Sequence, residues 1–331
     1  NGTALEIIDT TNNTVTTLPS FFNTSRYRYT SQLVGTKIYI PQDNGTGLEI
    51  IHTTNNTVTT LPSFFNASRY RNTNQLVGTK IYIPEWRGTA LDIIDTTNNT
   101  VTTLPSFFNA SRERSTSQLV GTKIYIPQRG GTALDIIDTT NNTVTTLPSF
   151  FNASRERNTS QLVGTKIYIP QNNGTALEII DTTNNTVTTI TSFFNASRYR
   201  YTSQLVGTKI YIPQHYGTAL DIIDTTTNTV TTLTNFFNAR RNRRTSQLVG
   251  TKIYIPQYGG TTLEIIDTTN NTVTTITNFF NASGYRSTSQ LVGTKIYIPE
   301  NNGMALDIID TTTNTVTTID SFFNASRQRY T

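Results

Sequence analysis

The chain has 331 residues, of which 35% are hydrophobic and 14% are charged, with a formal net charge of +5 and no cysteine. The lack of cysteine excludes disulfides and thiolate metal sites, and no apolar run approaches the roughly 20 residues that span a bilayer, so membrane insertion is not expected. A charge of this size spread over the whole length is weak support for a polyanionic partner, so nucleic acid is not the expected ligand.

One unit of 43 residues is repeated along the whole chain without insertion or deletion. Repeated units of this length bury their apolar faces against one another, so a single domain over residues 1–331 is expected. Near-identical units present the same surface many times, which favours a binding or structural protein over an enzyme. The copies begin at Asn1, Asn44, Arg87, Gly130, Asn173, Tyr216, Gly259 and Asn302, and the last copy is truncated.

Residues 1–22 supply only the last two strands, C and D, of a first unit. The next unit is read as strand A over residues 30–35, a Gly35-Thr36 turn, and an alternating strand B over residues 37–40 that Pro41 closes. Strand C follows over residues 48–51, and an Asn-rich turn leads to strand D over residues 58–61. Apolar residues on both faces of strand C, as at Ile7 and Ile8, suit a sheet that lies between two neighbours.

Four short strands in about 43 residues are typical of one blade of a β-propeller. The sequence therefore predicts an all-β fold of four-stranded antiparallel blades, with seven complete blades and a C–D half blade, in a seven- or eight-bladed ring. Three alternatives stay open for the half blade: a ring with an open strand edge, a ring with a free N-terminal hairpin, or a piece of a longer array. An open edge is a template for another chain, and the assembly candidates are Leu5, Ile7, Val15, Leu18, Phe322 and Phe323.

The repeat resembles two propeller families at specific residues. K-I-Y-I-P followed by I-I-D-T-T-N-N-T-V-T-T-L is similar to the surface-layer propellers named for a Tyr-Val-Thr-Asn motif. G-T-K-I-Y, D-T-T-N-N-T-V and S-R-Y-R are similar to kelch repeats, although Pro41-Gln42 replaces the kelch Gly-Gly doublet. The surface-layer resemblance implies an extracellular, cell-surface location.

The copies differ mainly in the B–C loop and in the D–A loop before strand A, which leave a propeller on one face. Aromatic residues beside arginine in such loops are typical of sugar or peptide recognition, although unconstrained drift of surface loops would give the same pattern. The candidates for this loop-face binding are Tyr27, Tyr70, Trp86, Arg87, Arg129, Tyr199, His215, Tyr216, Tyr258 and Tyr285. One Arg occupies the same position in every copy, from Arg28 to Arg329, and could bind an anionic polymer. A structural role, in which it forms hydrogen bonds to carbonyls or an ion pair with an acid, is favoured.

Strand C carries an acid such as Glu6, and a second acid such as Asp9 follows three residues later in every copy but one. Residues i and i+3 of a strand point to opposite faces, so the two cannot flank one glycosidic bond, and no catalytic residues are assigned. Asp9 is expected to cap the following turn, where His52 stands in the second copy. No cofactor is expected. Calcium in these turns is a weaker alternative because an EF-hand spacing is absent.

N-x-S/T sequons, the acceptors of N-glycans, recur in the predicted turns. Part of this density follows from duplication of one Asn- and Thr-rich unit. The candidate acceptors are Asn1, Asn12, Asn23, Asn44, Asn55, Asn66, Asn98, Asn109, Asn141, Asn152, Asn158, Asn173, Asn184, Asn195, Asn270, Asn281 and Asn324.

These features predict an extracellular or cell-surface, non-enzymatic propeller that acts as a structural or surface-coat unit. It is expected to be N-glycosylated and to self-associate linearly, head to tail, by strand complementation of its incomplete blade. The alternative is a multivalent module, lectin-like or adhesive, that binds a glycan or a surface protein through the variable loops.

Overall fold

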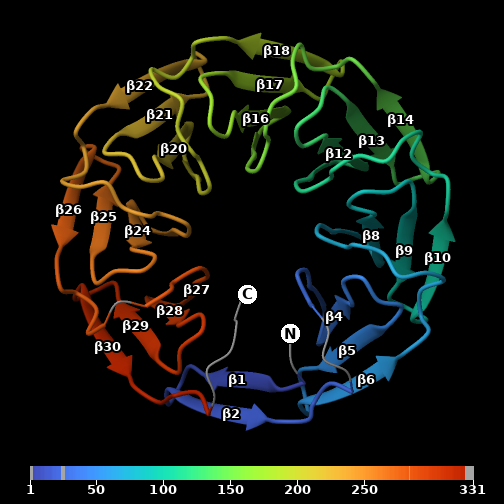
Figure 1. The fold of residues 1–331 in the computed structure, drawn as a ribbon, viewed down its shortest axis with the longest axis horizontal. Helices are drawn as coiled ribbons and strands as arrows, with labels where there is room; N and C mark the ends of the chain where they lie inside the picture. The colour runs from blue at the N-terminus through green and yellow to red at the C-terminus, as the bar shows by residue number, and fades with distance from the viewer. Residues whose placement is uncertain (1–2, 24–26, 283, 325–331) are drawn as a thin grey trace. The chain divides into compact units, whose positions relative to one another are not determined.

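The computed structural model describes residues 3–23, 27–282 and 284–324 (Figure 1). Every helix or strand within them is a β-strand, and no membrane-spanning helix is found among the residues described. Seven sheets have four antiparallel strands each, joined in sequence order, and the N-terminal sheet has two. The predicted all-β propeller fold, with seven four-stranded blades and an N-terminal pair of strands, is confirmed.

The strands recur at the same positions in every copy. The N-terminal pair is β1 (Leu5–Asp9) and β2 (Thr14–Leu18). Strand A is β3 (Gln32–Val34), β7 (Gln75–Val77), β11 (Gln118–Val120), β15 (Gln161–Val163), β19 (Gln204–Val206), β23 (Gln247–Val249) and β27 (Gln290–Val292). Strand B is β4 (Lys37–Pro41), β8 (Lys80–Pro84), β12 (Lys123–Pro127), β16 (Lys166–Pro170), β20 (Lys209–Pro213), β24 (Lys252–Pro256) and β28 (Lys295–Pro299).

Strands C and D complete each blade. Strand C is β5 (Leu48–His52), β9 (Leu91–Asp95), β13 (Leu134–Asp138), β17 (Leu177–Asp181), β21 (Leu220–Asp224), β25 (Leu263–Asp267) and β29 (Leu306–Asp310). Strand D is β6 (Thr57–Leu61), β10 (Thr100–Leu104), β14 (Thr143–Leu147), β18 (Thr186–Ile190), β22 (Thr229–Leu233), β26 (Thr272–Ile276) and β30 (Thr315–Ile319).

Turn chemistry sets the strand register. The A–B turn contains Gly35 at a φ of 58°, and the C–D turn contains Asn56 at a φ of 55°, both in the left-handed region that Gly and Asn tolerate best. With these turns in place, Lys37 pairs with His52 and Pro41 with Leu48. The same register recurs in the sheet of β11 to β14, where Lys123 pairs with Asp138.

Apolar side chains on both faces of strand C pack against the neighbouring sheets. Leu91, Ile93 and Ile94 of β9 are buried. Tyr82 and Leu91 form one cluster with Ile124 of the next sheet, and the Tyr82 hydroxyl donates a hydrogen bond to the carbonyl of Thr139 at 3.1 Å. Each blade therefore lacks a complete core until its neighbour is present, as a repeat architecture requires.

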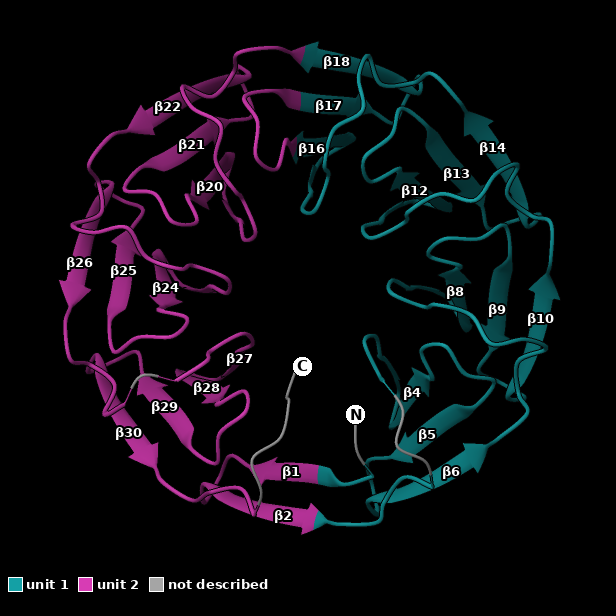
Figure 2. Cartoon of the chain, in the orientation of Figure 1, with its two compact units in different colours: residues 1–5, 18–169, 178–189 teal, residues 6–17, 170–177, 190–331 magenta. Residues whose placement is uncertain are grey.

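The chain divides into two compact units (Figure 2). One comprises residues 1–5, 18–169 and 178–189 and includes the three sheets from β3 to β14. The other comprises residues 6–17, 170–177 and 190–331 and includes the three sheets from β19 to β30.

The N-terminal hairpin of β1 and β2 is packed, so the alternative of a free hairpin is wrong. In the second unit, the Tyr297 hydroxyl donates to the carbonyl of Thr10 at 3.1 Å, as the Tyr39 hydroxyl donates to Thr96 in the first unit. In the first unit, Leu5 and Phe22 pack with Ile51, the counterpart of the contact among Leu48, Phe65 and Ile94. The hairpin thus makes the contacts of a C–D pair.

Candidate recognition surface on the variable loops

The variable B–C and D–A loops lie together, as the sequence predicts. The amide of Asp43 donates to the carbonyl of Tyr27 at 2.9 Å, and the amide of Asn44 donates to that of Arg69 at 2.8 Å. A B–C loop is therefore held between the D–A loop that enters its own sheet and the D–A loop that leaves it. The positions at which the copies differ consequently form one surface within each unit.

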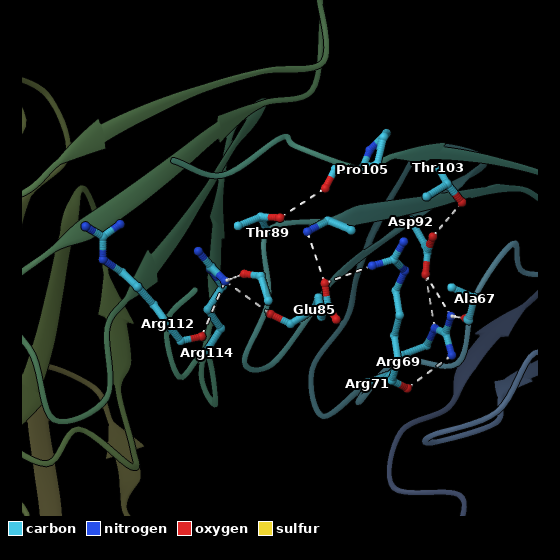
Figure 3. A network of polar contacts seen from close by, with 12 residues as sticks. Ala67, Arg69, Arg71, Glu85, Thr89, Asp92, Thr103, Pro105, Arg112 and Arg114 are labelled. Carbon is cyan, nitrogen blue, oxygen red and sulfur yellow. Dashed lines mark hydrogen bonds and ion pairs between the residues drawn. The ribbon is translucent and has the colours of Figure 1, made fainter. Parts of the chain in front are cut away.

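A buried arginine holds the B–C and D–A loops in place through hydrogen bonds (Figure 3). Arg71 donates from Nε and Nη2 to the Asp92 carboxylate at 3.1 and 2.9 Å, and from Nη1 to the carbonyls of Gln42 and Gly45 at 3.0 and 2.8 Å. Its guanidinium also lies 3.8 Å from the centre of the Phe65 ring. Burial lowers the pKa of Arg71, and the charge of Asp92 opposes that shift.

This arginine recurs in the other copies, and its role is structural rather than ligand-binding. Arg114 pairs with Asp135 at 3.0 Å and also donates to the carbonyl of Gly88 at 2.7 Å. Further buried examples are Arg157, Arg200, Arg243 and Arg286. Arg28 pairs with Glu49, and Arg329 lies outside the described residues. A buried, paired guanidinium is not accessible to an anionic polymer.

The two acids of strand C have different surroundings, which agrees with the sequence analysis. Asp92 is buried and also accepts a hydrogen bond from the Thr103 hydroxyl at 2.7 Å. Asp95 instead caps the C–D turn, accepting from the hydroxyl and the amide of Thr97 at 2.5 and 2.9 Å. These two hydrogen bonds lower the pKa of Asp95. Among the residues described, no three His, Asp or Glu side chains gather to hold a metal ion.

The predicted binding residues differ in accessibility. Tyr27, Tyr70, Tyr199, Tyr216 and Tyr285 are exposed. Trp86, Arg129 and Tyr258 are half-buried. Arg87 is exposed, but it lies over the Trp86 ring at 4.2 Å and forms an ion pair with Glu113. Among the residues that the structure describes, seven of the ten exposed large hydrophobic side chains are tyrosines of these loops, so the exposed aromatic surface is concentrated there.

His215 is a correction to the sequence prediction, because it supports the loop instead of facing a ligand. Only 5% of its surface is exposed, and its Nδ1 lies 3.1 Å from the carbonyl of Arg243. Its ring packs edge-on between Tyr201 and Tyr216, with centroid distances of 4.7 Å to both. Burial lowers the pKa of His215, and the carbonyl of Arg243 opposes the shift.

Tyr216 has a strained backbone and an exposed side chain. Its φ is 55°, in the left-handed region that costs a non-glycine residue about 1 kcal/mol. The same position is Gly130 in the fourth copy and Gly259 in the seventh. At 59%, Tyr216 is the most exposed of the described large hydrophobic residues, so burial does not offset this cost.

Three further side chains of the variable loops extend this surface beyond the predicted binding residues. Tyr29 and Tyr201 are exposed and stack on Tyr27 and Tyr199, with ring centroids 5.5 and 5.8 Å apart. Arg244 lies over the Tyr258 ring at 4.2 Å. The available signal was the spacing of two residues, which places both side chains on one face of an extended loop.

The sequons lie in turns and loops at both ends of the strands. Every described candidate is exposed except Asn158, which is half-buried, and Asn1 lies outside the described residues. In the C–D turns the Asn side chain accepts a hydrogen bond from the second residue after it, as Asn12 does from the amide of Thr14 at 3.2 Å.

The assembly candidates are not equally accessible. Phe322 and Phe323 are buried in a cluster that Val15 joins as a partly buried member, so these two phenylalanines are not free for another chain. Leu5, Ile7 and Leu18 are half-buried.

No protein-family model matches this chain, and no curated protein matches it. Solved structures match it in fold. Dihydro-heme d1 dehydrogenase NirN has 9% identity and a TM-score of 0.73, over 95% of this chain and 70% of that one. Apo AztD from Citrobacter koseri has 12% identity and a TM-score of 0.67, over 99% and 93%. Virginiamycin B lyase from Staphylococcus aureus has 14% identity and a TM-score of 0.60, over 82% and 91%. Identities this low show the shared β-propeller fold alone.

Proposed function

We propose that this protein is an extracellular, N-glycosylated, non-enzymatic propeller that binds glycans or surface proteins through its variable loops. The observation that carries the proposal is the concentration of exposed tyrosines, from Tyr27 to Tyr285, on loops that a buried Arg network holds in place. Rigid loops lose little entropy on binding, and tyrosine offers a large amphipathic contact area. The sequons and the resemblance to surface-layer propellers support the extracellular location.

Binding to immobilised polysaccharides and purified surface glycoproteins tests this function. Trp86→Ala and Tyr216→Ala are expected to weaken binding, because each removes an aromatic contact on the loop surface. His52→Asp, at the end of strand β5 and beside the C–D turn at the opposite end of the strands, is the matched control and is expected to bind normally. Equal binding by all three variants would argue against the loop surface.

A structural role through strand complementation is the second candidate, and a separate observation favours it. Among the described residues β1 pairs only with β2, and its residues Leu5 to Ile8 are half-buried where those of the other seven C strands are buried. The edge that pairs with strand B in the other copies could accept a strand of the same sequence.

Sedimentation velocity over a range of protein concentrations tests this second role. Linear, concentration-dependent assembly is expected, and the peptide S-Q-L-V-G-T-K-I-Y-I-P-Q is expected to suppress it by occupying the β1 edge. A monomer at all concentrations, or assembly that the peptide leaves unchanged, is the result that the strand-complementation role does not allow.

A further inference from the structure

Within the second unit, two groups of contacting side chains cross three successive copies, and the amide of Tyr258 joins them by donating to the carbonyl of Asn242 at 3.0 Å. Together they consist of Tyr199, Tyr201, His215, Tyr216, Asn242, Arg244, Tyr258 and Tyr285, here called the aromatic strip. Buried His215 joins two exposed tyrosines, and the Asn242 amide donates to the Tyr216 hydroxyl at 3.2 Å. Tyr258 and Tyr285 continue the strip with ring centroids 5.2 Å apart.

The backbone strain at Tyr216 destabilises the folded chain, and burial of its side chain does not compensate for it. Tyr216 is strained at a position where the other described copies that share its positive φ have Gly or Asn, and its ring remains mostly exposed. Strained backbone at an exposed aromatic residue is typical of binding sites.

The exposed charge along the strip is positive. Arg240 and Arg244 are exposed, no acidic residue lies in the loops that carry the strip, and Glu300 of the next B–C loop, beside Tyr285, is half-buried. The acids beneath it, Asp221 and Glu264, are buried and paired with Arg200 and Arg243. The aromatic pair of Tyr70 and Trp86 in the first unit differs, because Arg87 beside it is already paired with Glu113.

The copy at the centre of the strip contains no sequon. Residues 216–258 have Asn228 before Thr-Val and Asn238 before Ala-Arg, neither of which is an acceptor. An N-glycan therefore cannot be attached within this copy.

We propose that the aromatic strip binds an acidic polysaccharide. The exposed tyrosine rings would stack on the apolar faces of sugar rings, and Arg244 and Arg240 would pair with carboxylate or sulfate groups. Many tyrosines with few cations suit a polymer of sugar rings better than the closely spaced phosphates of a nucleic acid. This assignment rests on the proposed recognition function and adds its ligand class.

The test measures binding of the full chain to polygalacturonate, to its carboxyl-reduced neutral form and to oligo(dT), at low and high salt. Tyr216→Gly and Arg244→Ser replace each residue with one found at the same position in other copies, Gly259 and Ser287. Each is expected to weaken polygalacturonate binding roughly tenfold, the loss of one good contact. His52→Asp, with the residue of Asp95 at the same position of the repeat, is the control and should bind like the parent because it lies at the opposite end of the strands from the variable loops.

The proposal is supported if the parent binds polygalacturonate, if high salt weakens this binding, and if both strip variants lose it. Equal binding of the neutral polymer, lost in Tyr216→Gly alone, overturns the acidic class and leaves the recognition function standing. Tighter binding of oligo(dT) overturns the polysaccharide assignment. Absence of binding to every polymer, or binding that neither strip variant changes, overturns the acidic-polysaccharide assignment, and the recognition function fails with it only if the purified surface glycoproteins are not bound either. The midpoint of urea unfolding of Tyr216→Gly, expected at or above that of the parent, shows that lost binding is not lost folding.

Discussion

At the scale of single residues, one arginine per copy links three segments of the repeat. Arg71 connects the carboxylate of Asp92 on strand C, the B–C loop carbonyls of Gln42 and Gly45, and the D–A loop carbonyl of Ala67 at 3.2 Å. Since the partners are buried, removal of either charge leaves the other without compensation.

Arg71→Met is therefore expected to destabilise the chain by about 3–5 kcal/mol, and the double variant with Asp92→Asn by less than the sum of the single effects. Urea unfolding followed by circular dichroism measures each free energy. The exposed pair of Arg87 and Glu113 is the control, because Arg87→Asn should cost less than about 1 kcal/mol. Similar costs at the two sites would refute the structural role of Arg71.

His215 makes the stability of the chain depend on pH. Because its pKa is lowered in the folded state, the unfolded state binds more protons as the pH falls from about 7 through the ordinary value near 6.5. Stability should therefore decrease on acidification from pH 7.5 to 5.5. His215→Asn, the residue of Asn172 and Asn301 at this position, should flatten that dependence.

Urea midpoints of both proteins at four pH values measure this difference. Burial raises the pKa of Asp43, so this group makes the chain more stable as the pH falls, opposite to His215. Asp43 is present in both proteins, so its contribution to stability cancels in the comparison. Parallel curves for the parent and His215→Asn would contradict the assignment.

At the scale of elements, each sheet depends on the strand B isoleucines of the next sheet. Ile124 of β12 is 1% exposed and packs against Tyr82 and Phe108 of the preceding sheet. Ile38 of β4 is its counterpart beside the two-stranded sheet and is only half-buried, in a cluster with Phe22 and Ile40.

Ile124→Ala is thus expected to cost about 2–5 kcal/mol, and Ile38→Ala roughly half as much, because less apolar surface is lost and less of a cavity is left. The free energy of unfolding in urea distinguishes them. If Ile38→Ala were as costly as Ile124→Ala, the hairpin of β1 and β2 would have to pack against β4 as fully as a complete blade does.

At the scale of the whole molecule, exposed Asn and Thr turns and loops surround a nearly invariant apolar core. The described sequons lie at both ends of the strands and, apart from half-buried Asn158, are exposed, so glycans could be attached there without disturbing the blades.

Secretion from a eukaryotic cell is accordingly expected to give an intact mass above the 36.9 kDa of the bare chain, which peptide N-glycosidase should restore. Mapping of glycopeptides provides an internal control, because Asn228 and Asn238 lie outside any sequon and should stay unmodified. A secreted protein at the bare mass would remove the support that the sequons give to an extracellular location.

The sequence by itself determined the blade, because strand period, Gly and Asn turns and repeat length are local properties. It missed details that neighbouring sheets control. Strand A begins at Gln32 and not at residue 30, and Thr73, the equivalent of residue 30, contacts the next sheet through its hydroxyl, which lies 3.1 Å from that of Ser117.

The sequence also placed the recognition candidates on the correct loops, but only the tertiary structure separated exposed from supporting residues. His215 and Tyr216 are adjacent in the chain, yet one is buried against Arg243 and the other is exposed. The exposure and the pairing of a side chain depend on contacts between residues far apart in sequence, such as Arg71 and Asp92. The local pattern that predicts a strand therefore does not predict which side chains are exposed or paired.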